Sequence, residues 1–147
     1  MERLALALIA HDSKKGDMVS LLKSHRNELA ELDLVATRST GQVIQSRIGL
    51  PVTLMQSGPH GGDQQIGALV ANGNVRAVIF LRDPLMAQPH EPDISALLRI
   101  CDVHNVPLAT NLATAEAVLH LLFEHPEALG GHHLAAEFLK EMAAVHE

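Results

Sequence analysis

Residues 77–81 read Ala77-Val78-Ile79-Phe80-Leu81, five apolar side chains in a row. A strand in a parallel sheet has this pattern, because helices cover both faces of the sheet and leave no side for polar residues. Short apolar runs of this kind alternate along the chain with longer amphipathic segments. This alternation predicts an α/β domain with a central, mainly parallel five-stranded sheet flanked by helices.

The boundaries of the expected elements follow from the apolar runs and the turn residues between them. The expected strands are Leu4–Ala10, Asp33–Ala36, Val52–Met55, Val75–Leu81 and Val106–Ala109. The expected helices are about Lys15–Glu31, Gly41–Ile48, Asp63–Asn72, Asp93–Asn105 and Ala113–Phe123. The character of the sequence changes after Phe123. We therefore expect one α/β domain over residues 1–123 and a helical tail over residues 124–147, packed on the domain or on a neighbouring subunit.

The size and composition of the chain exclude some classes of binding partner. The chain has 147 residues, the size of one domain, with a formal net charge of -6 and an aromatic content of 2%. Nucleic acids and anionic membranes bind basic surfaces, and unpaired bases stack on aromatic side chains. We therefore expect neither partner. A small phosphorylated ligand fits the composition, because a few local cations and backbone amides can hold it.

The first apolar run and the single cysteine bear on localisation. The run over residues 4–10 is short, and the charged segment His11-Asp12-Ser13-Lys14-Lys15 follows it at once, so we expect a strand rather than a signal peptide. No other segment is long enough to span a bilayer. Cys101 has no partner for a disulfide and lies in an apolar helical stretch, which predicts a buried packing residue and a reducing, cytoplasmic location.

Polar residues gather after the end of every expected strand. The clusters are His11-Asp12 with Lys14-Lys15, Thr37 to Gly41, Ser57 to Gln65, Asp83 to Asp93, and Thr110-Asn111. Open parallel sheets bind ligands at the carboxyl edge of their strands. These clusters therefore predict one ligand site at that edge, whereas Arg82, Arg47 and Arg99 have no motif around them and are expected to be surface charges.

The segment Ser57-Gly58-Pro59-His60-Gly61-Gly62-Asp63-Gln64-Gln65 is the most informative of these clusters. Its glycines allow a tight turn with exposed amides, where an anion can bind. Asp63 lies beside that position, and a nearby phosphate would raise the pKa of its carboxyl toward the range of a general base. The alternative is that Asp63 only caps the helix that follows.

Two further loops allow both a functional and a structural interpretation. The segment Thr37-Arg38-Ser39-Thr40-Gly41 offers hydroxyls and amides for phosphate oxygens, or it is a turn in which Thr40 caps a helix. It has no Gly-Lys-Ser/Thr ending, and no Gly-x-Gly-x-x-Gly follows the first strand, so nucleotide binding is disfavoured.

The proline-rich loop around His90 is stiffened by Pro84, Pro89 and Pro92. The loop fixes where Asp83, His90 and Asp93 point, so that the imidazole can donate to a carbonyl oxygen and a neighbouring carboxylate can orient the ring. The structural alternative is that Asp93 caps the next helix. The pair His132-His133 lies beside glycines and is expected to be an exposed turn rather than a metal site.

Taken together, these segments resemble methylglyoxal synthases. The resemblance runs from Leu4 to about Leu122, and the residues that carry it are Ala10-His11-Asp12, Ser57-Gly58-Pro59, Gly61-Gly62-Asp63, Asp83-Pro84-Leu85, Pro89-His90-Glu91-Pro92-Asp93 and Ala109-Thr110-Asn111. The resemblance implies a Rossmann-like α/β subunit, usually assembled as a homohexamer. It also implies a lyase that converts dihydroxyacetone phosphate to methylglyoxal and inorganic phosphate without a cofactor or a metal, with phosphate acting as product and inhibitor.

The resemblance also assigns roles to residues. Asp63 matches the catalytic base, His90 and Asp93 match residues that polarise and organise the reacting end of the substrate, and Asp12 and His11 match active-site residues. The phosphate cradle is matched by Lys15, Thr37, Thr40, Ser57 and Gly58. The family usually has Thr-Gly-Thr-Thr-Gly in the second loop, where this chain keeps a hydroxyl at Ser39 but has Arg38 in place of a glycine. Arg38 is strained if the position needs a positive φ; otherwise it adds a contact to phosphate or to another subunit.

Two other classes of function stay open from the sequence. The same fold occurs as a regulatory domain that binds a small phosphorylated ligand without chemistry. A metal-dependent hydrolase is the second alternative, because five side chains are potential ligands: His11, Asp12, Asp63, His90 and Asp93.

Overall fold

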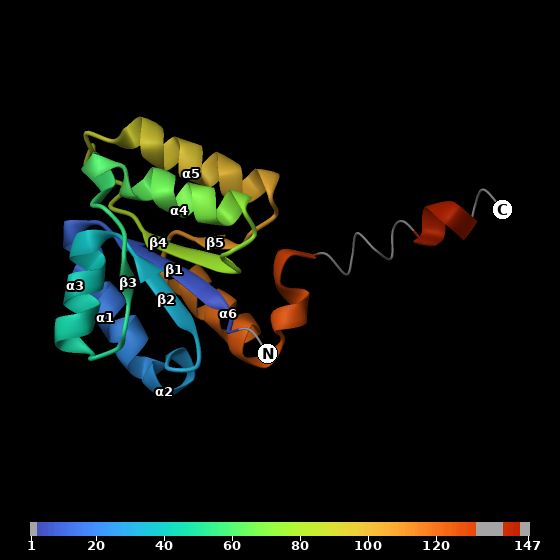
Figure 1. Cartoon of the computed structure of the whole chain (residues 1–147), viewed down its shortest axis with the longest axis horizontal. Helices are drawn as coiled ribbons and strands as arrows, with labels where there is room; N and C mark the ends of the chain where they lie inside the picture. Colours follow the sequence, from blue (N-terminus) through green and yellow to red (C-terminus); the bar gives the residue numbers. More distant parts are fainter. Residues whose placement is uncertain (1–2, 132–139, 145–147) are drawn as a thin grey trace.

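The computed structural model describes residues 3–131 and 140–144. Its centre is a parallel five-stranded sheet with the strand order β3-β2-β1-β4-β5 (Figure 1). The strands are β1 (Ala5–Ala10), β2 (Asp33–Ala36), β3 (Thr53–Leu54), β4 (Ala77–Leu81) and β5 (Leu108–Ala109). The α-helices are α1 (Lys15–Ser24), α2 (Arg26–Leu29), α3 (Arg38–Arg47), α4 (Gly62–Ala71), α5 (Glu91–Val103) and α6 (Leu112–Glu124). Short 3-10 helices are η1 (Asp12–Lys14), η2 (Gly58–His60) and η3 (Pro126–Gly131).

Helices cover both faces of the sheet, and the side chains of β1 alternate between two apolar cores. Leu6 and Leu8 belong to the core formed with α1, α3 and α6, while Ala7 and Ile9 belong to the core formed with α4 and α5 (Figure 1). This is the period of two expected of a strand. The expected three-layer α/β fold with a parallel sheet is confirmed. Within the described part of the chain, no helix is long and apolar enough to cross a membrane.

Several boundaries differ from those expected from the sequence. The segment expected as one helix over Lys15–Glu31 is divided at His25, which leaves helical geometry with φ −123° and ψ 23°. The His25 imidazole instead lies 2.9 Å from the Glu116 carboxylate of α6. The helix expected from Gly41 begins three residues earlier at Arg38. The two outer strands, β3 and β5, are each two residues long rather than four.

The chain continues to pack on the domain after α6. Leu129 of η3 is buried in the core beside α6, and Arg76 donates to the Pro126 carbonyl oxygen at 2.6 Å. Residues 140–144 are helical and exposed. The pair His132-His133 lies outside the described residues.

Cys101 is fully buried in the core of α4 and α5, as expected of a packing residue. Burial raises the pKa of its thiol to about 11, and the nearby Asp102 carboxylate adds to this shift. The thiolate form is therefore suppressed at neutral pH, which argues against a role as nucleophile.

Candidate active site

The carboxyl end of β1 and the segments that follow β1, β2, β3 and β4 line a cavity of about 130 Å³. This volume is below the roughly 300–1,000 Å³ of pockets for drug-sized ligands, so it suits a very small molecule. The residues that line it are Ile9, Ala10, His11, Asp12, Lys15, Thr37, Ser39, Ser57, Gly58, Pro59, Asp63, Gln88 and His90.

Asp63 is the only fully buried acidic residue of the described chain, and neither of its carboxyl oxygens has a hydrogen-bond partner there. It lies in the first turn of α4 but does not cap the helix, because Gly61 occupies the N-cap position with φ 98°. Burial raises the pKa of the Asp63 carboxyl, and the charge of Asp93 raises it further, while His90 acts in the opposite direction. A carboxylate without hydrogen bonds is well suited to accept a proton from a bound substrate.

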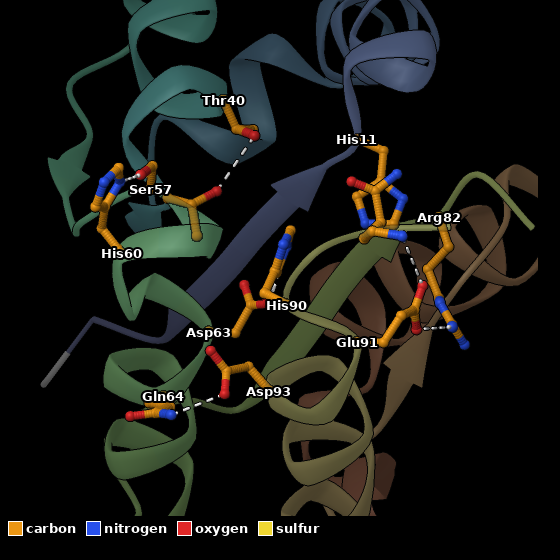
Figure 2. A network of polar contacts seen from close by, with 12 residues as sticks. His11, Thr40, Ser57, His60, Asp63, Gln64, Arg82, His90, Glu91 and Asp93 are labelled. Carbon is orange, nitrogen blue, oxygen red and sulfur yellow. Dashed lines mark hydrogen bonds and ion pairs between the residues drawn. The ribbon is translucent and has the colours of Figure 1, made fainter. Parts of the chain in front are cut away.

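His90 stands over Asp63 at the end of the proline-rich loop (Figure 2). Its Nε2 lies 3.6 Å from Asp63 Oδ2, and the side chain is 9% exposed. A Cβ atom on Gly58 would lie 2.5 Å from the same nitrogen, so the close approach of the imidazole depends on a glycine at this position. The turn at Gly58 therefore helps to fix His90 beside the Asp63 carboxylate.

His11 is buried at the end of β1, and its hydrogen bonds define its tautomer. The backbone N–H of Asp83 donates to His11 Nδ1 at 2.8 Å, so the proton of the neutral ring lies on Nε2. That nitrogen is buried and has no partner among the described residues. Burial lowers the pKa of the ring, and electrostatic interactions with His90 and Arg82 lower it further. His11 is thus a neutral imidazole with a free N–H donor at the cavity.

One lysine and three hydroxyl-bearing side chains also line the cavity. Lys15 Nζ donates to the Ala10 carbonyl at 3.1 Å and to Asp12 Oδ1 at 2.6 Å. This hydrogen bond, together with the lysine charge, lowers the pKa of the Asp12 carboxyl. The hydroxyls of Thr37, Ser39 and Ser57 come from two other loops at the same cavity. Donors of this kind suit a phosphate group.

Comparison with known proteins agrees with this geometry. The family model described as MGS-like domain matches residues 17–110. The methylglyoxal synthase of Moorella thermoacetica is 59% identical over 123 residues, which cover 84% of this chain and 96% of the relative. The chain belongs to the methylglyoxal synthase family.

Other members of the methylglyoxal synthase family agree with this assignment. The enzyme of Thermus thermophilus is 59% identical over 115 residues, covering 78% of this chain and 91% of the relative. A crystal structure of methylglyoxal synthase from Elizabethkingia anophelis superposes with a TM-score of 0.75 at 44% identity, covering 80% of this chain and 77% of that one. Both the sequence and the fold are therefore similar to those of this family over most of the chain.

The structure brings together most of the residues that the family resemblance selected. The predicted residues that line the cavity are His11, Asp12, Lys15, Thr37, Ser39, Ser57, Gly58, Asp63 and His90. They come from four loops that are far apart in the sequence. The fifth polar cluster does not join them, because Thr110 and Asn111 line a separate cavity of about 500 Å³.

Two predicted phosphate-binding residues of the Thr37–Gly41 segment, Arg38 and Thr40, do not line the cavity. Thr40 is buried inside α3, where its hydroxyl accepts from Ala10 N at 3.1 Å and donates to Ala10 O at 3.3 Å. It fixes the end of β1, and the alternative that it caps the helix is wrong because Thr37 is the N-cap. Arg38 is exposed as the first residue of α3. The condition for strain at Arg38 is not met, because Asn105 is the only non-glycine residue with positive φ in the described chain.

Asp93 lies behind Asp63 rather than in the cavity. It borders a groove between α4 and α5, and its Oδ1 accepts from Gln64 Nε2 at 2.8 Å (Figure 2). It does not cap α5, whose N-cap is His90. In this structure Asp93 therefore acts on Asp63 through its charge, and the prediction of direct contact with substrate gains no support.

Several polar residues around the cavity were not predicted as site residues from the sequence. Gln88 lines it, and His60 and Gln64 contact residues of the predicted site. The only sequence signal was their position inside the two selected loops. Arg82 was expected to be a surface charge, but its Nε is buried without a partner in the described chain, and its guanidinium lies 3.8 Å from the Glu91 carboxylate.

The two alternative functions have less support. Among residues 3–131 and 140–144, no three His, Cys, Asp or Glu side chains are grouped so that they could hold a metal ion. The metal-dependent hydrolase therefore lacks its expected cluster. A regulatory domain is not favoured either, because the relatives that match the chain over most of their length are named as synthases.

Proposed function

We propose that the protein converts dihydroxyacetone phosphate to methylglyoxal and inorganic phosphate. The observation that carries this proposal is Asp63, a fully buried carboxylate with no hydrogen-bond partner in the described chain, beside His90 in a cavity with phosphate-binding groups. The high identity to named methylglyoxal synthases supports the same reaction.

Proton transfer to Asp63 is the first step. The carboxylate removes a proton from the hydroxymethyl carbon next to the substrate carbonyl, and the electron pair of the C–H bond forms the enediolate. Asp63 suits this role because burial raises the pKa of its carboxyl, which makes the carboxylate a stronger base.

Negative charge then develops on the carbonyl oxygen and needs a hydrogen-bond donor. The imidazole of His90, held against Gly58 and Asp63, is placed to donate to it. The neutral ring of His11 offers a second donor through Nε2. Fixed donors of this kind stabilise an oxyanion strongly when water is excluded from the site.

Elimination of phosphate completes the reaction. The hydroxyl on the carbon that lost its proton to Asp63 gives its own proton to the departing phosphate and becomes the aldehyde. The C=C electron pair of the enediolate moves to the neighbouring C–C bond as the C–O bond breaks, and the C–O pair leaves with the phosphate. The enolate that remains takes up a proton at the terminal carbon, which replaces the one removed by Asp63, to give methylglyoxal. Lys15 and the hydroxyls of Thr37, Ser39 and Ser57 are proposed to bind the phosphate. Their donors stabilise the charge on the leaving group and hold the C–O bond out of the plane of the enediolate.

The test is to incubate purified protein with dihydroxyacetone phosphate and to follow methylglyoxal and phosphate together. We expect equal release of both products, and we expect Asp63→Asn to abolish release while circular dichroism shows an intact fold. Folded wild-type protein that releases neither product would exclude the proposal.

The assembly and location of the protein are part of the same proposal. A homo-oligomer, a hexamer by resemblance to the family, gains support from two adjacent apolar side chains on the loop after β4, since Leu85 is 95% and Met86 is 63% exposed. Residues 124–147 are proposed to pack on the domain or on a neighbouring subunit. The free Cys101 is consistent with the proposed cytoplasmic location.

A further inference from the structure

The hydroxyl of Ser57 is held from outside the cavity by a histidine. Ser57 Oγ lies 2.7 Å from His60 Nδ1, and both residues belong to the turn around η2 (Figure 2). Ser57 lines the cavity, whereas the His60 side chain is exposed and does not line it. Within residues 3–131 and 140–144, the Ser57 hydroxyl has no other hydrogen bond. His60 therefore controls the direction of this hydroxyl.

The direction matters because a serine hydroxyl has one proton and two lone pairs. If His60 Nδ1 carries no proton, Ser57 donates its own proton to the ring and presents only lone pairs to the cavity. A phosphate oxygen is an acceptor, and two facing acceptors repel each other. If Nδ1 carries a proton, the ring donates to Ser57 Oγ, and the serine proton is free to bind phosphate.

We propose that His60 is a positioning residue for phosphate recognition: it donates from Nδ1 to Ser57, which in turn donates to a phosphate oxygen in the cavity. The inference rests on the proposed function in one respect, namely that the phosphate group binds beside Ser57. Phosphate binding selects the form of His60 that is protonated at Nδ1. The histidine thus contributes to affinity without touching the ligand.

Three substitutions of His60 separate the possible effects. In Asn and Asp, the terminal nitrogen or oxygen lies at the position of histidine Nδ1. His60→Ala removes the hydrogen bond, His60→Asn keeps an N–H donor, and His60→Asp offers only acceptors that take the proton of Ser57 and repel phosphate. The expected order of phosphate affinity is wild type, then Asn, then Ala, then Asp.

The measurement is calorimetric titration of the purified protein with inorganic phosphate, together with steady-state kinetics. We expect His60→Ala to raise the Kd for phosphate by about three- to tenfold, which is the change expected from the loss of one hydrogen bond. The KM for dihydroxyacetone phosphate should rise in parallel, with a much smaller change in kcat. His104→Ala, at the exposed end of α5, serves as the control and should leave both constants unchanged.

Measuring the His60→Ala change in a Ser57→Ala protein distinguishes an effect through the Ser57 hydroxyl from an effect of the His60 charge alone. In Ser57→Ala, the further change His60→Ala should leave the phosphate Kd the same. An equal loss in both backgrounds, or an Asn variant no better than Asp, would overturn the proposal, as would wild-type protein that binds no phosphate. Phosphate binding that depends on His60 in a protein without turnover would refute the proposed reaction and leave this inference standing.

Discussion

Asp63 combines two properties that oppose each other in a folded protein. Its complete burial, with no hydrogen-bond partner among the described residues, makes the carboxylate reactive, and the same burial makes the ionised form unfavourable for the fold. The raised pKa of Asp63 expresses this penalty. Catalytic groups commonly carry such strain, and their replacement by an inactive residue often stabilises the protein.

We therefore expect Asp63→Asn to be more stable than the wild type at pH 8, by about 1 kcal/mol or roughly 2–4 °C in Tm. Because the folded pKa of Asp63 lies above its unfolded value, the penalty is fully present above the folded pKa and disappears as the pH falls toward the unfolded value. Thermal melts at pH 8 and pH 4 measure the change. A difference between the two proteins that is the same at both pH values would contradict this account.

Asp93 is predicted to set the pKa of the Asp63 carboxyl from outside the cavity. Its negative charge raises the pKa of the Asp63 carboxyl, so Asp93→Asn should lower that pKa and move the acid limb of the kcat/KM profile to lower pH. The control is Asp102→Asn, an exposed residue near the other end of α5, which should leave the limb in place. An unchanged limb in Asp93→Asn would show that Asp93 does not act through Asp63.

At the scale of elements, Gly58 of η2 lies against His90, the N-cap residue of α5. Gly58→Ala would place a methyl group 2.5 Å from His90 Nε2, so the imidazole must move. We expect kcat to fall by about tenfold to a hundredfold, the effect of displacing a catalytic group by about 1 Å. The matched control is Gly16→Ala in α1, where the added methyl meets nothing within 4 Å. It should keep full activity and gain up to about 0.5–1 kcal/mol in stability. Equal kcat in both variants would contradict the proposed role of the contact.

The sequence was a good guide to strands and to the loops that follow them. Runs such as Ala77–Leu81 are apolar because the sheet is covered on both faces, and this is a local signal. The orientation of helices around their own axes is not local. Asp93 faces Gln64 because α5 packs on α4, and Thr40 faces Ala10 because α3 packs beside β1. The sequence therefore placed both residues near the site, but it could not predict these hydrogen-bond partners.

At the scale of the whole molecule, association is the main prediction. We expect light scattering to give the mass of six chains of 15.8 kDa. Leu85→Asp should reduce that mass, because a charge replaces a side chain that is 95% exposed in the single chain and is expected to be covered in the assembly. A monomeric wild type would exclude the assembly, and a variant of unchanged mass would place the interface elsewhere.

The central position of β1 has a consequence for biosynthesis. This strand is made first, yet its two neighbours are β2, which pairs Asp33 with Ala5, and β4, which pairs Ala77 with Leu6. While the ribosome adds the residues between them, one edge of β1 has no partner, and the nascent chain is exposed to aggregation. The cavity cannot close until His90 has left the exit tunnel. Slow translation before that point should therefore favour chaperone binding over early folding of the amino-terminal half.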